Sequence, residues 1–285
     1  MNIIIAKDAG YCFGVRDAVD LAFDIAKKNG EVYMLGDIVH NEKVVNDLSK
    51  SGAKVVNSLN DIPENSTVLF RAHGTKNDIW DDAKRRSLNI KDATCPLVYE
   101  IHKEVKSLAK DGRQIIVIGD HGHDEVVAIA NQVPNTIVIA TPKEANKLKK
   151  VKRAGIVSQS TQTIENVQAI INILMTKFFD LHFVNTICYP TKRNQEQIKE
   201  LASIVDVMII IGSFTSANSK RLTMLSSNIN KNTYQVSDKI EIDKLWFKDC
   251  KSVGISAGAS TPDYLINQIE DAIKNIGNKL WKKIH

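Results

Sequence analysis

The sequence lacks any apolar run that approaches the roughly 20 residues a helix needs to span a bilayer. Its first residues, MNIIIAKDAGYC, lack the basic region, long apolar core and cleavage site of a secretory signal or transit peptide. Only four cysteines occur among 285 residues, too few for a secreted disulfide framework. These absences predict a cytoplasmic protein with no membrane partner, whose thiols are metal ligands, catalytic groups or core residues.

Several common binding motifs are also absent. The sequence contains no GxxxxGK[ST] or GxGxxG segment, so a nucleotide is not indicated, and no C-x2-C pair of the kind that usually supplies part of a zinc site. The formal net charge of +5 suits a small anionic substrate but is too mild to indicate nucleic acid. We interpret the basic run KLKKVKR (147–153) as a solvated helix end rather than a binding patch.

What the sequence does contain is a threefold repeat, marked by Cys12, Cys95 and Cys188. Each of these cysteines follows a short apolar run typical of a strand and precedes a stretch typical of a helix. A polar residue in a second strand-to-helix loop lies 28 positions after each one: His40, His123 and Ser216. The thirds of the chain therefore share one layout.

Each third continues with further strands and helices, and its last Val/Ile run enters a polar turn that ends at Thr75, Thr161 or Thr261. Continuous Val/Ile runs flanked by helices are typical of parallel strands covered on both faces. We predict α/β units with right-handed crossovers. The last third lacks a closing strand, so we expect the N-terminal strand at residues 2–6 to pair there.

This layout predicts an α/β fold, a pseudo-threefold trefoil of small domains with mainly parallel sheets around a central site. The expected domains are residues 13–95, 96–188 and 189–285, the last completed by residues 1–12. Because ligands of open α/β sheets lie beyond the carboxyl ends of the strands, we expect the loops of all three domains to meet at one cleft.

Three equivalent cysteines at such a centre indicate an iron–sulfur cluster, whose thiolate ligands can be far apart in sequence. A cube held by three protein thiolates keeps one iron open, as catalytic metal sites do. A zinc site and inert buried thiols remain alternatives at this point. Cys250 lies outside the repeat, and we interpret it as a structural thiol.

A second set of candidates consists of imidazole, hydroxyl and amide groups at the matched loops. Any one of them alone is more often a turn former, but their repetition favours a binding role. Together with backbone N–H groups and helix N-termini they suit a phosphate or diphosphate. The set comprises His40, Asn41, His73, His123, Ser216, Asn218 and Ser260.

Glu125, in GDHGHDEVV, is a carboxylate two residues after the marker position His123. It is either a helix N-terminal acid that complements the macrodipole or a general acid beside an iron-bound oxygen. Ser160 and Thr161 in the neighbouring turn could relay the proton. His121 we interpret as structural.

Ordered segments over the whole length, among them AGYCFGVRDAV, RAHGT, DATCP, GHDE, SQST, TICYPT, GSFTSANSKRL and AGAST, make the sequence similar to the 4-hydroxy-3-methylbut-2-enyl diphosphate reductases. These are the terminal enzymes of the methylerythritol phosphate route to isoprenoids. The resemblance implies three α/β domains around one [4Fe–4S] cluster per chain, held by Cys12, Cys95 and Cys188. It implies a two-electron, two-proton removal of the substrate's allylic hydroxyl as water, giving isopentenyl and dimethylallyl diphosphates, with reduced ferredoxin or flavodoxin as donor.

The resemblance also implies roles for the polar loops. The substrate hydroxyl would bind the fourth iron, Glu125 would supply protons, and the Ser160 hydroxyl would hold the substrate oxygen. The diphosphate would lie among His40, His73, His123, Ser216, the backbone of Ala217, Asn218 and Ser260.

The sequence departs from the family's usual pattern at two positions. Ala217 stands where the family usually has serine, and Ser160 stands where it usually has threonine. We expect somewhat weaker or rearranged diphosphate contacts, with activity retained. Two other functions compete with the reductase: a non-redox protein that binds a phosphorylated small molecule, and a zinc hydrolase or lyase.

Overall fold

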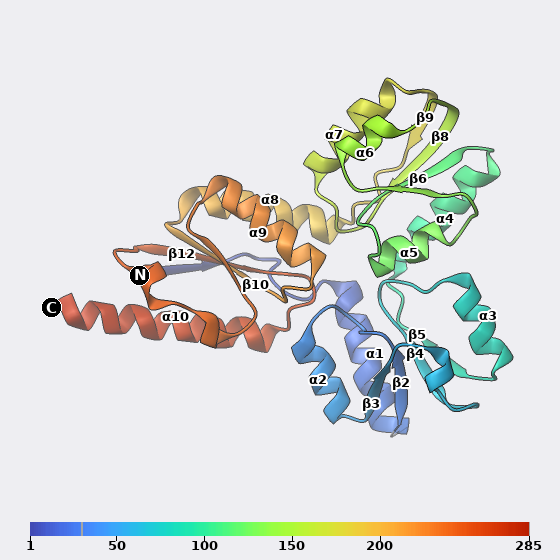
Figure 1. The fold of residues 1–285 in the computed structure, drawn as a ribbon. Helices are drawn as coiled ribbons and strands as arrows, with labels where there is room; N and C mark the ends of the chain where they lie inside the picture. The colour runs from blue at the N-terminus through green and yellow to red at the C-terminus, as the bar shows by residue number, and fades with distance from the viewer. Residues whose placement is uncertain (30, 285) are drawn as a thin grey trace. The chain divides into compact units, whose positions relative to one another are not determined.

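The computed structural model describes residues 1–29 and 31–284, over which strands alternate with helices (Figure 1). Residue 285, the last of the expected third domain, lies outside the described residues. The strands form three four-stranded sheets, which we call the first, second and third sheets in chain order. The first contains β2 (Val32–Leu35), β3 (Ala53–Val56), β4 (Thr67–Phe70) and β5 (Asn89–Asp92). The second contains β6 (Gln114–Ile118), β7 (Ile137–Ile139), β8 (Val151–Ser158) and β9 (Phe178–Phe183). The third contains β10 (Val207–Ile211), β11 (Thr233–Val236), β12 (Ser252–Ala257) and β1 (Asn2–Ile5).

The helices follow the strands as crossover connections. They are α1 (Phe13–Asn29), α2 (Glu42–Lys50), α3 (Asn77–Arg85), α4 (Pro96–Lys110), α5 (Asp124–Ala130), α6 (Pro142–Lys147), α7 (Ile164–Met175), α8 (Tyr189–Ile204), α9 (Ala217–Ile229) and α10 (Asp263–Ile284). Short 3-10 turns lie at Leu59–Asp61, Lys239–Glu241 and Lys244–Phe247.

One strand order is repeated in the three sheets: β3-β2-β4-β5, β7-β6-β8-β9 and β11-β10-β12-β1. Every pairing in them is parallel, which confirms the predicted parallel α/β fold. The N-terminal strand β1 pairs with β12, with Asn2 opposite Ser252 and Ile5 opposite Ile255. The strand that the last third lacked is therefore supplied by the N-terminus, as expected.

Strands of a parallel sheet are apolar on both faces where helices cover both faces. In β10, Met208 and Ile210 pack with residues of α8 and α9, whereas Ile209 and Ile211 pack with residues of α10. Side chains alternate between faces along a strand, so only a continuous apolar run can fill both cores. Figure 1 shows α8 and α9 on one side of this sheet and α10 on the other.

The second sheet is covered in the same way. One core contains residues of α4 and α5 packed on Ile115 and Val117, and the other contains residues of α6 and α7 packed on Ile116 and Ile118. On the first sheet, α3 covers a core that includes Val68 and Phe70. The helices therefore pack on the faces of the sheets, and the loops that carry the candidate residues follow the carboxyl ends of the strands.

The chain divides into two compact units. One consists of Met1–Phe13, His40–Val44 and Tyr189–His285, and it contains the third sheet. The other consists of Gly14–Val39 and Val45–Cys188, and it contains the first and second sheets. Below, they are called the third-sheet unit and the two-sheet unit. Among the described residues, no helix has the length and apolar character that crossing a membrane requires.

Candidate functional site

The three cysteines of the repeat occupy equivalent places in the three sheets. Cys12, Cys95 and Cys188 follow β1, β5 and β9, which hold the same position in the repeated strand order. Each thiol is partly buried, and none of the three forms a disulfide. Each cysteine therefore lies between one of these strands and the helix that follows it, directly before the first residue of that helix.

The Cys95 thiol lies close to the backbone of Gly14, near the start of α1. A Cβ atom placed on Gly14 would lie 2.4 Å from Cys95 Sγ, closer than any real contact, so α1 can pass this thiol only with glycine at that position. Cys95 also precedes α4, whose first residue is Pro96. A helix N-terminus favours the thiolate form, which is the form that ligates metals.

The chemistry of this donor set fits an iron–sulfur group. Three partly buried thiols at equivalent strand ends supply soft ligands of the kind that iron–sulfur clusters use. Cys250, by contrast, lies outside the repeated positions, where burial raises the pKa of its thiol and Sγ contacts the carbonyl oxygen of Ser252 at 3.2 Å. That environment is consistent with the structural role expected for Cys250.

Glu125 is a buried carboxylate, only 2% exposed, on the first turn of α5. Its two oxygens accept hydrogen bonds from Ser160, one from the backbone N–H at 2.6 Å and one from the Oγ hydroxyl at 2.8 Å. The backbone N–H of Cys188 in turn donates to the carbonyl oxygen of Ser160 at 2.9 Å. Within the two-sheet unit, Ser160 therefore connects the candidate acid to a candidate metal ligand.

His123 begins α5 as its N-cap. Its Nδ1 accepts a hydrogen bond from the backbone N–H of Glu125 at 3.2 Å, so Nδ1 carries no proton and the neutral ring is protonated at Nε2. The His73 ring meets the His123 ring edge-on, with 5.6 Å between ring centroids. Arg71, at the end of β4, forms an ion pair with Asp124 on α5. These contacts hold two candidate imidazoles together in one unit.

The third-sheet unit holds an anion-compatible helix start. Ser216 caps α9, its hydroxyl accepting from the backbone N–H of Ser219 at 3.3 Å. Ala217 and Asn218 are the first two residues of α9, so their N–H groups are among those that a helix leaves unsatisfied. The candidate residues Ser216 and Asn218 are both buried.

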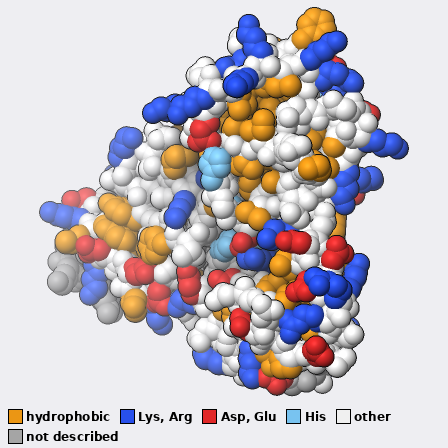
Figure 2. Space-filling view, turned by 45° about the vertical axis from the view of Figure 1, so that its right-hand side comes forward, with side chains coloured by type: hydrophobic (Ala, Val, Ile, Leu, Met, Phe, Trp, Pro, Cys, Tyr) orange, Lys and Arg blue, Asp and Glu red, His pale blue; other side chains and the backbone are white. Residues whose placement is uncertain are grey.

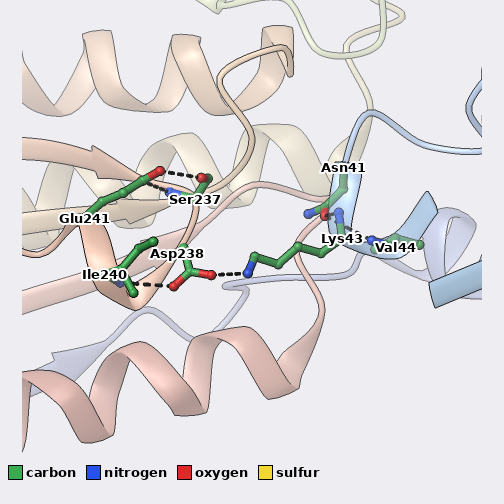
Figure 3. Close-up of polar contacts among 7 residues, drawn as sticks. All are labelled: Asn41, Lys43, Val44, Ser237, Asp238, Ile240 and Glu241. Carbon is green, nitrogen blue, oxygen red and sulfur yellow. Dashed lines mark hydrogen bonds and ion pairs between the residues drawn. The ribbon is translucent and has the colours of Figure 1, made fainter. Parts of the chain in front are cut away.

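His40 and Ser260 lie together in the same unit. Ser260 Oγ donates to the carbonyl oxygen of His40 at 3.2 Å, and Asn41 Nδ2 donates to the carbonyl oxygen of Ser260 at 2.9 Å. Asn41 Oδ1 also accepts from the backbone N–H groups of Lys43 and Val44, at 3.1 and 3.3 Å, which caps α2 (Figure 3). The amide of Asn41 thus links the start of α2 to the turn after β12.

Each candidate side chain is accounted for in one of the units. His40, Ser216, Ala217, Asn218 and Ser260 lie in the third-sheet unit with Cys12; His73, His123, Glu125 and Ser160 lie in the two-sheet unit with Cys95 and Cys188. His121 is an exposed residue that contacts Glu144 at 2.7 Å, consistent with the structural role expected for it.

Sequence reasoning missed Glu42, Lys43 and Asp238, which form side-chain contacts beside these loops. The only signal was that Glu42 and Lys43 directly follow His40 and Asn41. Figure 2 shows basic and acidic side chains on the same face, with hydrophobic side chains between them. The charge of this face therefore does not mark a binding surface.

The fold and the loops define a class: a parallel α/β protein with an anion-compatible helix start, a buried carboxylate and three equivalent thiols. The chain belongs to the LytB protein family, whose profile matches residues 3–274.

Relatives match over nearly the full length. A 4-hydroxy-3-methylbut-2-enyl diphosphate reductase of Geobacter sulfurreducens is 40% identical over 98% of this chain and 99% of its own. One of Geotalea daltonii is 39% identical over 97% of this chain and 98% of its own.

Two solved structures are similar as well. The E-1-hydroxy-2-methyl-but-2-enyl-4-diphosphate reductase of Plasmodium falciparum is 28% identical, with a TM-score of 0.90 over 95% of this chain and 87% of that chain. A second, described as (E)-4-hydroxy-3-methyl-but-2-enyl diphosphate reductase, the terminal enzyme of the non-mevalonate pathway, is 37% identical. Its TM-score is 0.72, over 96% of this chain and 100% of that chain.

Proposed function

We propose that this chain is an iron–sulfur oxidoreductase that removes the allylic hydroxyl of 4-hydroxy-3-methylbut-2-enyl diphosphate. The observation that carries the proposal is its full-length similarity to reductases of that substrate, at up to 40% identity. The buried Glu125–Ser160 pair supports it, because a carboxyl group held away from bulk water can deliver a proton at one defined place. The zinc hydrolase and the non-redox binding protein have no comparable support.

The metal ligands in this proposal are Cys12, Cys95 and Cys188, brought together by three α/β domains with the boundaries 13–95, 96–188 and 189–285 plus 1–12. A bound [4Fe–4S] cluster would supply electrons and, at an iron without a protein ligand, Lewis acidity toward the substrate hydroxyl. The repeated strand order supports equivalent roles for the three thiols, and the space that Gly14 leaves for Cys95 Sγ supports a ligand role there.

The diphosphate is the part of the substrate that these loops bind. His123 presents Nε2–H, and the first N–H groups of α9, the Ser216 hydroxyl and the Asn218 amide add further donors. His40, His73 and Ser260 complete the set. Binding at this remote, charged group orients the hydroxyl end of the substrate, so that binding energy lowers the barrier to reaction.

Glu125 is the proton donor of the proposed reaction. The carbon–oxygen bond of the allylic alcohol breaks, and the oxygen leaves as water after it takes up a proton. Two electrons from the donor leave the carbon fragment as an allyl anion, and the second proton, added at one or the other end of it, gives isopentenyl or dimethylallyl diphosphate. Ser160 orients the Glu125 carboxylate by donating to both of its oxygens.

The electron donor that we propose is a reduced ferredoxin or flavodoxin in the cytoplasm. Both are one-electron carriers, so two deliveries would complete one turnover. Neither nucleic acid nor a membrane is needed by the proposed reaction.

The decisive experiment is turnover under anaerobic conditions. The purified protein should be brown, contain about four iron atoms per chain and absorb broadly near roughly 400 nm. It should convert the hydroxylated allylic diphosphate with a chemical reductant. Each of Cys12→Ser, Cys95→Ser and Cys188→Ser should abolish iron binding and turnover, whereas Cys250→Ser should preserve both. A colourless protein containing one zinc, or a fully loaded protein that leaves the substrate unchanged, would refute the proposal.

A further inference from the structure

The His40–Val44 segment belongs to the third-sheet unit although the chain on both sides of it belongs to the other unit. Within the third-sheet unit, its side chains contact the residues that follow three strands of one sheet. These are the loop after β10, the turn after β12 and the turn after β11. Two of these loops carry candidate diphosphate ligands, so the segment is placed to fix their geometry.

Glu42 makes the contact with the loop after β10. Its carboxylate accepts hydrogen bonds from Ser213 Oγ at 2.7 Å and from Thr215 Oγ1 at 3.0 Å. The Ser213 hydroxyl also accepts from the backbone N–H of Thr215 at 3.0 Å. This small network ends one residue before Ser216, the cap of α9. Glu42 therefore holds the loop that aims the first N–H groups of α9.

Burial opposes the ionisation of Glu42. Hydrogen bonds from Ser213, from backbone N–H and from Thr215, together with the nearby His40, nevertheless keep the pKa of Glu42 below its ordinary value. The ionised carboxylate is the acceptor that the Ser213 and Thr215 hydroxyls share, and in that role Glu42 orders the loop.

Lys43 makes the contact with the residue after β11. Its ammonium group forms an ion pair with Asp238, and the other carboxylate oxygen of Asp238 accepts from the backbone N–H of Ile240 at 3.0 Å (Figure 3). The side chains of Lys43 and Asp238 are 35% and 25% exposed, so the pair is partly shielded from solvent. Asn41 completes the set through its bond to the carbonyl oxygen of Ser260, after β12.

We infer that Glu42 and Lys43 are positioning residues for the diphosphate site, which brace His40, the Ser216 loop and the Ser260 turn in the geometry that receives the anion. This inference rests on the proposed function. It assigns no contact with substrate to either side chain: both act through the loops that they hold. Loss of the Glu42 or the Lys43 side chain therefore weakens anion binding and leaves the rate of the chemical step unchanged.

The first test measures binding of inorganic diphosphate to the anaerobically purified, cluster-loaded protein by calorimetry. Glu42→Ala should raise the Kd for diphosphate ~10-fold, because the loop hydroxyls lose their shared acceptor. Glu42→Gln, which keeps a carbonyl acceptor, should restore most of the affinity. In turnover assays KM should rise by a similar factor while kcat stays within about twofold, the pattern of lost uniform binding.

The second test uses the ion pair. Lys43→Met and Asp238→Asn should each raise the Kd for diphosphate ~3-fold, and the double variant should be no worse than either single one. The exchange Lys43→Asp with Asp238→Lys should recover affinity. The matched control is Lys54→Met, which breaks the exposed Lys54–Glu31 pair on the first sheet and should leave the Kd unchanged.

The outcomes separate the two proposals. Wild-type affinity in both Glu42→Ala and Lys43→Met overturns the positioning role. A wild-type protein that does not bind diphosphate overturns the proposed function itself. Should Glu42→Ala fail to fold, Lys43→Met and Asp238→Asn still decide, because an effect of these variants on thermal unfolding alone, without a change in Kd, contradicts positioning.

Discussion

The hydroxyl and the backbone N–H of Ser160 both donate to the carboxylate of Glu125, at 2.8 and 2.6 Å. The two residues lie 35 positions apart in the chain, on the turn after β8 and the first turn of α5. Both elements pack on the second sheet, so the carboxylate is held by groups that cannot move independently. The orientation of the candidate acid is therefore set by the fold of one sheet.

Ser160→Ala removes one of these two bonds and leaves the other. We expect kcat to fall ~10-fold with little change in KM, because the carboxylate loses its fixed orientation while the diphosphate loops are untouched. Ser160→Thr keeps the hydroxyl and restricts its rotamers, so it should retain at least wild-type kcat. Steady-state kinetics of the cluster-loaded variants provides the measurement, and Ser160→Ala with undiminished turnover would remove Ser160 from the mechanism.

Gly14→Ala places a methyl group 2.4 Å from the Cys95 sulfur atom. Since both the helix backbone and the thiol must shift, we expect iron content per chain to fall by at least half under anaerobic purification. Alanine is otherwise favourable in a helix, so secondary structure should be preserved.

The matched control is Gly112→Ala. Gly112 adopts a positive φ of 71°, so alanine there is strained, but a Cβ would contact nothing within 4 Å. This variant should be less stable yet keep its full iron content. Equal iron content in the Gly14→Ala variant would contradict a crowded ligand site at Cys95.

The sequence was sufficient to predict those features that depend on local pattern. The Val/Ile runs of β6, β8, β10 and β12 required helices on both faces, and the unpaired N-terminal strand could only fill the gap beside β12. The candidate loops were recognisable because each follows such a run. The helix that follows the marker residue His40 is capped by the next residue, Asn41.

The contacts that Glu42 and Lys43 of the His40–Val44 segment make could not be predicted in this way. Lys43 and Asp238 are 195 positions apart, and Glu42 and Ser213 are 171 apart. In the sequence, Glu42 and Lys43 look like ordinary charges on the first turn of an exposed helix. Contacts of this kind depend on which loops the folded sheet brings together. The spacing of apolar residues along the sequence does not indicate which loops those are.

His102 on α4 predicts a pH dependence of stability. Its side chain is 5% exposed and its Nε2 has no hydrogen-bond partner among the described residues. Burial, helped by the charge of Lys106 and opposed by Asp92, lowers the pKa of His102 to about 4. An unfolded histidine has a pKa near ~6.5, so between these values the unfolded chain binds more protons and stability rises with pH.

Lowering the pH from 7 to 5 should therefore cost the wild-type protein ~2 kcal/mol of unfolding free energy through His102 alone. Replacing His102 with Gln removes that titration, and the difference between the two pH values should shrink accordingly in anaerobic urea unfolding. His182, an exposed residue of β9, offers a control, since its replacement by Gln should leave the difference unchanged. Identical pH dependence in His102→Gln and wild type would show that the buried imidazole does not govern it.

Ala217 is the first residue of α9, directly after the cap Ser216. Its backbone N–H can donate to an anion, but its methyl group cannot. Ala217→Ser adds a hydroxyl at the helix N-terminus, where a further donor to a diphosphate is favoured by the macrodipole. We expect the Kd for inorganic diphosphate and the KM for substrate to fall ~3-fold, with kcat unchanged. Ala217→Gly keeps the N–H without a hydroxyl and should show no such gain, so that equal affinities in the serine and glycine variants would place the diphosphate away from the start of α9.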